Sequence, residues 1–398
     1  MPEFLKRSWA VVNLDHLAHN VGVIREQLQP ACMLMGVVKA DAYGHGECYI
    51  SAELERLGVN WFGVSNINEA IALREQGIEK PILIFGATPP EHAGALSRHS
   101  ITQAVYSLEY AGLLQAAAAD AGVTLQMHIK VDTGMSRLGF VAAEDKWEQT
   151  VEDITKACRL PNLRAQGIFT HFASADELDE DGAGYTSRQF EAFEQIILQL
   201  SERGILFELH HCCNSAGVMN YPHMHMDMVR PGILLYGLLP SGDCAGKLDI
   251  KPVMELYSSV SMVKEIPENT AVSYGRIYHS HRPTRVATVA IGYADGYERA
   301  LSNKSRMLVR GQYANVIGRV CMDQLMLDVT HIPEVSAGDL VTIVGQDGEN
   351  TLTFDEMAEL CGTVNYEKVC LLGRRVPRVY RRNGKDIVVV DYSRIPVK

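Results

Sequence analysis

The chain has 398 residues, of which 47% are hydrophobic and 21% are charged, and its formal net charge is −11. This length allows two domains, and the apolar content is that of an ordinary globular protein. The excess of acidic residues argues against a nucleic-acid partner and against an anionic membrane surface, because both require clustered lysine and arginine.

The cysteines and the N-terminus indicate the compartment. Nine cysteines without metal-type spacing indicate reduced thiols. Residues 1–9 lack the apolar core of a signal peptide, and no apolar run approaches the roughly 18 residues of a membrane helix. We therefore expect a cytoplasmic protein with no membrane segment. The His- and Met-rich stretch 221–226 could suggest a metal, but we expect a surface loop there and no metal site.

The first half of the chain alternates between strand-like and helical patterns. An extended segment, 9–14, precedes a helix over 17–28, which Asp15 could cap. Eight strand-like apolar runs then begin near residues 33, 61, 81, 101, 125, 163, 207 and 228, and helical periodicity follows most of them, as over 67–76, 108–121 and 187–203. This pattern predicts an α/β fold with an N-terminal (β/α)8 TIM barrel. A doubly wound open sheet is the alternative, although it usually has fewer units.

The first of these runs ends in Lys39, followed by Tyr43, Gly44 and Gly46. Burying an ammonium group is costly unless the charge is paired or used chemically. Desolvation lowers the pKa of a lysine, which can then form a Schiff base or act as a general base. An ordinary strand end before a glycine-rich turn is the alternative, because the stretch matches neither a dinucleotide fingerprint nor a phosphate loop.

Polar residues also follow the later strands. The fifth strand runs into Arg137, the sixth ends at His171, the seventh at Asn214 and Ser215, and the eighth at Arg230. In a barrel the carboxyl ends of all strands lie at the same face, which is where such enzymes place their sites. The topology therefore predicts one shared site.

After residue 243 the pattern changes to short β-like runs over 253–263, 285–291, 314–317, 324–329 and 340–344, with a helical piece at 354–360. We therefore predict two domains, a barrel over 1–243 and a C-terminal mostly-β domain over 244–398. Tyr274, Tyr293 and Tyr366 stand beside unusual motifs in the second domain. Taken singly, such tyrosines are most often half-buried strand residues.

A family resemblance rests on nine motifs that occur together and in order: VVKADAYGHG, KVDTGMSRLGF, FTHFASAD, HCCNSA, VRPGILLYG, VSYG, IGYADGY, GRVCMDQLMLDVT and GTVNYE. Through them the chain resembles the alanine racemases, pyridoxal phosphate enzymes with an N-terminal barrel and a C-terminal β domain. The motifs extend over nearly the whole chain. The resemblance also implies that residues 1–14 pack with the C-terminal domain.

The resemblance implies catalytic roles for four residues. Lys39 would carry pyridoxal phosphate and serve as the base on one face of the substrate, and Tyr274 would be the base on the other. A phenol has a reference pKa of about 10, so such a base needs support. The family places Arg230 against the pyridine nitrogen and His171 between Arg230 and Tyr274. A histidine satisfied within the barrel is the alternative for His171.

The resemblance also implies the binding residues. The cofactor phosphate would be held by Tyr43, Ser215, the amides of Gly232 and Ile233, and Tyr366, with Asn214 beside them. The substrate carboxylate would contact Arg137 and the Met322 amide, and Asp323 and Tyr293 would lie near the entrance. Lys130 matches a lysine that is often carbamylated in this family, and an ordinary salt bridge of Lys130 is the alternative.

We therefore expect an isomerase, an alanine racemase that supplies D-alanine for peptidoglycan synthesis, although a role in alanine breakdown stays open. The family implies an obligate homodimer in which each β domain completes the partner's site. A serine or broad-specificity racemase of the same fold is the first alternative, and Tyr366 argues against it because it leaves little room beyond a methyl group. A basic-amino-acid decarboxylase lacks its expected motifs here. A non-catalytic pyridoxal phosphate carrier would resemble the barrel alone.

Overall fold

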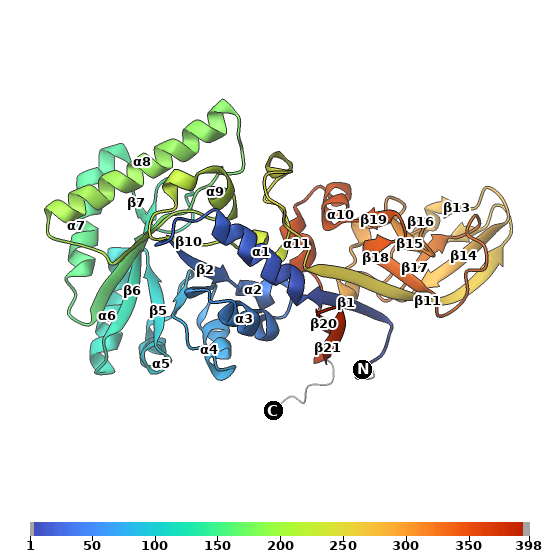
Figure 1. Ribbon diagram of the computed structural model, residues 1–398, viewed down its shortest axis with the longest axis horizontal. Coiled ribbons are helices and arrows are strands. Elements are labelled where there is room, and N and C mark those ends of the chain that lie inside the picture. Colours follow the sequence, from blue (N-terminus) through green and yellow to red (C-terminus); the bar gives the residue numbers. More distant parts are fainter. Residues whose placement is uncertain (1–3, 393–398) are drawn as a thin grey trace. The chain divides into compact units, whose positions relative to one another are not determined.

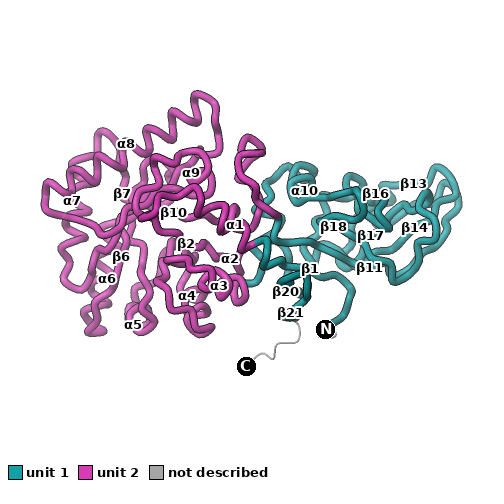
Figure 2. The backbone as a smooth tube through the Cα atoms, viewed as in Figure 1, with its two compact units in different colours: residues 1–16, 43–46, 252–398 teal, residues 17–42, 47–251 magenta. Residues whose placement is uncertain are grey.

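The structure is a computed structural model that describes residues 4–392. It divides into two compact units, shown in different colours in Figure 2. Unit 1 contains residues 1–16, 43–46 and 252–398, and unit 2 contains residues 17–42 and 47–251. Each unit is therefore assembled from separate stretches of the chain. No helix within residues 4–392 combines the length and the apolar character needed to cross a bilayer.

Unit 2 is built on parallel strands in the order β10-β2-β3-β4-β5-β6-β8-β9. The N–H groups of Asp227 and Arg230 donate to the carbonyls of His210 and Cys213 at 3.1 and 2.9 Å, which joins the two ends of this order into a ring. The predicted barrel is thus confirmed. Its strands are β2 (Met33–Val37), β3 (Trp61–Val64), β4 (Ile82–Ile84), β5 (Ile101–Val105), β6 (Leu125–Asp132), β8 (Leu163–Phe169), β9 (Leu209–His211) and β10 (Met228–Val229), with β7 (Phe140–Val141) paired to β6.

Apolar side chains from these strands fill the interior of the barrel. One buried cluster takes a residue from each of seven strands: Met35, Trp61, Leu83, Ala104, Phe169, Leu209 and Met228. Burying a large apolar side chain contributes about 1.5–3 kcal/mol, so this layer accounts for the strand-like apolar runs. The helices in this part of the chain are α1 (Leu14–Glu26), α2 (Lys39–Tyr43), α3 (Glu47–Arg56), α4 (Ile67–Glu75), α5 (Ala93–Arg98), α6 (Leu108–Asp120), α7 (Trp147–Cys158), α8 (Glu180–Glu202) and α9 (Ser215–Asn220).

Three local predictions were wrong. Helix α1 is capped by Asn13, whose Oδ1 accepts the N–H groups of Asp15 and His16 at 3.0 and 3.2 Å, so Asp15 is not the cap. Helix α8 begins at Glu180 rather than 187, because Asp179 caps a polar first turn without an apolar pattern. The stretch 221–226 is not a surface loop, since three of its residues, Tyr221, Met224 and His225, are buried.

Unit 1 is a ten-stranded sheet in the order β19-β18-β15-β16-β17-β14-β11-β1-β20-β21. The N-terminal strand β1 lies inside it, antiparallel to β11 and parallel to β20 (Figure 1). The strands are β1 (Ser8–Asn13), β11 (Met254–Ile266), β14 (Thr284–Val289), β15 (Arg306–Val309), β16 (Gln312–Val316), β17 (Leu325–Asp328), β18 (Leu340–Asp347), β19 (Asn350–Leu352), β20 (Arg378–Arg382) and β21 (Lys385–Val390). A separate hairpin, β12 (Ala271–Val272) and β13 (Tyr278–His279), and two helices, α10 (Phe354–Cys361) and α11 (Asn365–Cys370), complete the predicted mostly-β domain.

Candidate active site

Strand β2 delivers Lys39 to a left-handed turn. The four residues that follow, 40–43, all have φ between 52 and 54°. An L-residue in this conformation costs roughly 1–2 kcal/mol, so the turn must be held from outside. The Glu69 carboxylate holds it: one oxygen accepts the Ala40 N–H at 2.9 Å, and the other accepts the Ser65 N–H at 2.7 Å. Lys39 thus stands at the start of a strained and supported turn, as is common at functional sites.

The end of this turn belongs to unit 1. A Cβ on Gly44, which has φ +78°, would lie 2.1 Å from the carbonyl oxygen of Val369, so only glycine fits there. The aromatic rings of Tyr43 and Tyr366 have their centroids 6.3 Å apart. Two of the residues expected to bind phosphate are therefore neighbours.

Strand β6 provides Lys130 and leads to Arg137. Oδ1 of Asp132 accepts the N–H groups of Gly134 and Ser136 at 3.0 and 2.9 Å, which shapes the loop before the exposed Arg137. Within residues 4–392 the buried Lys130 Nζ has no hydrogen-bond partner and no salt bridge, and it lies 4.8 Å from the centre of the Phe169 ring. Burial lowers the pKa of Lys130 well below its ordinary value, and the charges of Arg230 and Arg137 lower it further.

Arg230 follows β10 and is almost completely buried, with 3% exposure. Its Nη1 donates to His211 Nδ1 at 2.8 Å, and its Nη2 donates to the carbonyls of Thr170 and Cys212 at 2.8 and 3.0 Å. Nη2 also lies 3.4 Å from Nδ1 of His171. Burial lowers the pKa of Arg230 to about 10, so the guanidinium stays protonated at neutral pH. Four fixed acceptors therefore orient one buried cation.

A row of neutral histidines extends from Arg230 into the barrel. His211 accepts at Nδ1, so its own proton is on Nε2, which donates to His128 Nδ1 at 2.9 Å. Burial, and then the charge of Arg230, lowers the pKa of His128 to about 3 and those of His171 and His211 well below their ordinary values. The row was not predicted. The available signal was His128 two residues before Lys130 in an apolar strand, a spacing that puts both on one face.

Four of the residues predicted to bind the cofactor, Asn214, Ser215, Gly232 and Ile233, follow the ends of β9 and β10. Ser215 Oγ accepts the N–H groups of Gly232 and Leu234 at 2.9 and 3.4 Å. Asn214 caps α9 through its Oδ1, and the buried Ile233 begins a 3₁₀ turn beside Gly232. A hydroxyl and backbone amides are suitable donors for a phosphate.

The charges of unit 2 suit an anionic ligand. Burial lowers the pKa of His171, and the charges of Arg230, Arg137 and Lys39 lower it further, so the basic side chains of this unit act on one imidazole. With the hydroxyl and amides at the ends of β9 and β10, this donor set fits pyridoxal phosphate, which carries a phosphate, a phenolic oxygen and an aldehyde for a lysine.

The other predicted site residues lie in unit 1. Tyr274 is 71% exposed and follows Ser273, whose φ is +65° and whose hydroxyl donates to the Arg319 carbonyl at 2.7 Å. Tyr274 lines a cavity of about 410 Å³ together with Cys321. Met322 and Tyr293 are 53% and 43% exposed.

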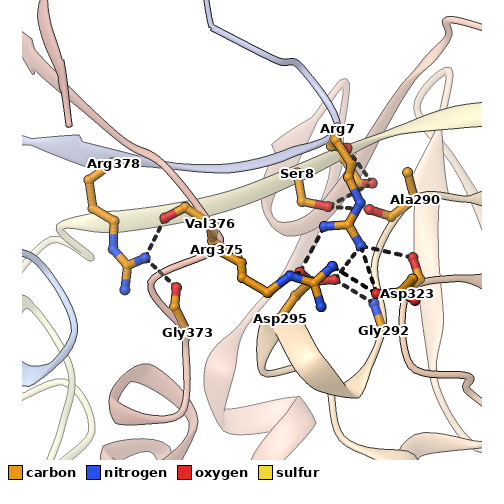
Figure 3. A network of polar contacts seen from close by, with 11 residues as sticks. Arg7, Ser8, Ala290, Gly292, Asp295, Asp323, Gly373, Arg375, Val376 and Arg378 are labelled. Atoms are coloured by element: carbon orange, nitrogen blue, oxygen red, sulfur yellow. Dashed lines mark hydrogen bonds and ion pairs between the residues drawn. The ribbon is translucent and has the colours of Figure 1, made fainter. Parts of the chain in front are cut away.

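Asp323 belongs to a charge network with Arg7, Asp295 and Arg375 that was not predicted (Figure 3). Arg7 donates to both carboxylate oxygens of the fully buried Asp295, at 2.8 and 2.7 Å. Arg375 pairs with Asp323 at 2.7 Å. No local pattern could reveal the network, because Arg7 and Asp295 are 288 residues apart.

The site residues thus form separate groups. Unit 2 brings together the cations, His171 and the donors at the ends of β9 and β10. Unit 1 brings together Tyr43 and Tyr366, and backbone hydrogen bonds join Tyr293 and Ala294 to Cys321 and Met322.

Comparison with known proteins gives a consistent family. Residues 12–240 match the family described as alanine racemase, N-terminal domain, and residues 253–380 match alanine racemase, C-terminal domain. The alanine racemase of Desulfovibrio desulfuricans is 44% identical over 380 residues, covering 96% of this chain and 100% of that protein. Alanine racemase 1 of Clostridium acetobutylicum is 41% identical over 385 residues, covering 96% and 98% of the two chains.

Solved structures agree. The alanine racemase of Clostridium difficile superposes with a TM-score of 0.91 at 36% identity, covering 98% of this chain and 100% of that one. The alanine racemase of Bacillus anthracis with bound L-Ala-P has a TM-score of 0.91 at 32% identity, covering 98% and 99%.

Proposed function

The chain belongs to the alanine racemase family of isomerases, and we propose that it interconverts L-alanine and D-alanine with pyridoxal phosphate as its cofactor. One observation carries the proposal. The charges of Lys39, which is held on its strained turn, and of the protonated Arg230 both lower the pKa of the neutral His171. A lysine and a cationic donor are what this cofactor needs for attachment and for its ring nitrogen.

The proposed reaction uses two bases. When bound, pyridoxal phosphate would withdraw electrons from Cα of the attached amino acid and make its hydrogen acidic. Lys39 Nζ takes or returns the Cα proton on one face, and the Tyr274 hydroxyl does so on the other. Arg230 cannot give up a proton at neutral pH, so toward the ring nitrogen it would act as a hydrogen-bond donor only, which would limit side reactions such as transamination. His171 accepts at Nδ1 and keeps its proton on Nε2.

We assign the remaining residues to binding the cofactor or the substrate. We assign the cofactor phosphate to the hydroxyls and amides, and the substrate carboxylate to one arginine and one amide. The cofactor-binding residues are Tyr43, Asn214, Ser215, Gly232, Ile233 and Tyr366; the substrate-binding residues are Arg137 and Met322, with Asp323, Tyr293 and Tyr366 around the entrance. Tyr366 restricts the space beside the substrate β carbon.

We further propose that Lys130 is carbamylated. The lowered pKa of the buried Lys130 favours its neutral amine, the form that adds carbon dioxide to give a carbamate and a released proton. The negative product would be favoured by the charge of Arg137, which lowers the pKa of Lys130. We expect ¹³C NMR of protein equilibrated with ¹³C-bicarbonate to show a carbamate signal that Lys130→Ala removes. An unchanged spectrum in that variant would assign the signal elsewhere and end the proposal.

We propose that the active form is a homodimer in the cytoplasm that supplies D-alanine for peptidoglycan synthesis. The side chain of Tyr274 is 71% exposed, and water weakens electrostatic interactions with neighbouring groups at such a position. Exposed Met262, Ile277 and Met322 accompany it in unit 1 and favour coverage by a second subunit. Eight of the nine cysteines are free thiols, namely Cys32, Cys48, Cys158, Cys212, Cys213, Cys244, Cys321 and Cys361, which agrees with a reducing compartment.

The test is racemisation in heavy water. Purified protein with pyridoxal phosphate and L-alanine should lose optical activity while deuterium enters Cα, and L-serine in parallel should react more slowly because Tyr366 limits the space. Lys39→Ala should abolish the exchange, whereas Lys146→Ala, which changes an exposed lysine outside the site, should not. If visible absorbance shows bound cofactor but neither amino acid exchanges, the proposed function is wrong and a carrier or decarboxylase becomes the better explanation.

A further inference from the structure

We propose that Arg7 and Asp295 are positioning residues that fix the direction of the Met322 N–H group toward the substrate carboxylate. The inference rests on the proposed function, which assigns that carboxylate to Arg137 and Met322. All the groups that carry it lie in unit 1.

A tight turn supports the Met322 segment from behind. In the 3₁₀ turn Tyr293–Asp295, the Tyr293 N–H donates to the Cys321 carbonyl at 3.1 Å, and the Ala294 N–H donates to the Met322 carbonyl at 3.0 Å. The two segments touch closely, since a Cβ on Gly292 would lie 2.3 Å from the Cys321 oxygen and 2.4 Å from the Met322 oxygen. The turn and the segment therefore move together.

Peptide planarity converts this contact into a direction. In a trans peptide the carbonyl and the following N–H lie in one plane and point in opposite directions. Because the Cys321 carbonyl faces the Tyr293 N–H, the Met322 N–H must point away from the turn. No acceptor within residues 4–392 takes this N–H, and Met322 is 53% exposed. The amide is thus aimed outward and available to a ligand.

Asp295 and Arg7 hold the turn itself. The fully buried Asp295 accepts the Gly292 N–H on Oδ2 at 3.0 Å, which closes the turn. The Arg7 fork binds both oxygens of Asp295, and its Nη2 also donates to the Asp323 carbonyl at 3.0 Å. One guanidinium therefore connects the turn to the segment that it supports, as Figure 3 shows.

Neighbouring contacts restrain Arg7 and reinforce the network. Ser8, the next residue in the chain, donates to the Ala290 carbonyl at 2.6 Å, so the backbone beside Arg7 is fixed to the strand end that leads into the turn. Arg375 pairs with the Asp323 carboxylate and lies 3.6 Å from Asp295. A buried carboxylate needs such partners, because an unpaired buried charge is costly.

The first experiment measures the turn directly, without reference to catalysis. Hydrogen exchange followed by mass spectrometry should show faster exchange in Arg7→Met, for a peptide containing Tyr293 and Ala294, than in the unsubstituted protein. Arg310→Met is the matched control: Arg310 makes the same kind of fork with Asp339 in unit 1, at 2.9 and 3.4 Å, but does not contact the turn. Unchanged exchange at the turn in Arg7→Met would overturn the proposal.

The second experiment is kinetic. Arg7→Met should raise KM for L- and D-alanine by roughly tenfold, the size expected when a hydrogen bond to a charged group is weakened, while kcat changes little. The inhibition constant of propionate, which keeps the carboxylate and lacks the amine, should rise in parallel. Arg7→Lys keeps the charge without the fork and should give an intermediate effect, and Arg310→Met should give none. A fall in kcat with unchanged KM and propionate inhibition would contradict the positioning role.

The outcomes separate the two proposals. If the unsubstituted protein does not racemise alanine but Arg7→Met still speeds hydrogen exchange at the turn, the proposed function is wrong. The proposal that Arg7 supports the Met322 segment then stands. If Arg7→Met does not fold, Gly292→Ala tests the same contact, because its Cβ would push the Cys321 and Met322 carbonyls away. It should raise KM and the propionate inhibition constant together, and an unchanged pair of constants would overturn the proposal.

Discussion

At the scale of single residues, the barrel contains an unusual set of buried neutral histidines. Burial, and then the charge of Arg230, lowers the pKa of His128, His171 and His211, because protonating any of them would place a further positive charge in a buried site that already holds Arg230. His211 and His171 accept hydrogen bonds from Arg230, and His128 accepts one from His211, so protonating any of these acceptor nitrogens would break a hydrogen bond of the row. The ordering of Arg230 therefore depends on these rings staying neutral.

This arrangement predicts a pH dependence of stability. The pKa of His128 is about 3 in the folded protein against 6.5 in an unfolded chain, so between these values the unfolded chain binds a proton that the folded one does not. Stability from this residue is complete above about pH 6.5 and is lost as the pH falls below it, by up to about 1.4 kcal/mol per pH unit. At pH 5.5 the protein should take up about one proton more on unfolding than His128→Leu does.

Calorimetric unfolding in buffers of different ionisation enthalpy measures that proton uptake directly. His279→Gln, which changes an exposed histidine, should unfold with the same uptake as the unsubstituted protein. Equal uptake for His128→Leu and the unsubstituted protein would mean that His128 is already charged in the fold.

At the scale of elements, the repeating strands could be predicted from the sequence. Features that depend on local backbone geometry or on contacts with distant residues could not. The predicted starts of the barrel strands at 33, 61, 101, 125, 163 and 228 are those of the structure, because each strand buries an apolar run in the barrel. The left-handed turn after Lys39 was not predicted, although its residues were singled out. Alanine and tyrosine do not favour a left-handed conformation. The turn is supported by Glu69, which lies on α4, after the next barrel strand.

Cap identity shows the same limit. Asp15 and Asn13 are both good capping residues, and only the backbone geometry selects Asn13. Similarly, the catalytic candidates at strand ends were predictable because barrel topology gathers them. The Arg7–Asp295 fork was not predictable, because the residues around Arg7 do not indicate that its partner is Asp295, and those around Asp295 do not indicate Arg7.

At the scale of the whole molecule, the candidate residues are divided between two units. Unit 2 carries Lys39, and unit 1 carries the exposed Tyr274. If the proposed homodimer is correct, a working site combines Lys39 of one subunit with Tyr274 of its partner. Each subunit would then contribute Lys39 to one site and Tyr274 to the other. A substitution of one of these residues would leave the other residue of that subunit able to act in its own site.

Mixing two inactive variants tests this arrangement. Lys39→Ala and Tyr274→Phe should each lose racemisation, because each lacks one of the two bases. After denaturation and refolding together with pyridoxal phosphate, half of the dimers should be mixed, and each mixed dimer should hold one site with both bases. About a quarter of the normal activity should therefore return, as the symmetry of a two-fold dimer requires. Sites built within single chains would regain none, since every site would still lack one base. A fully active monomer in sedimentation would exclude the dimer itself.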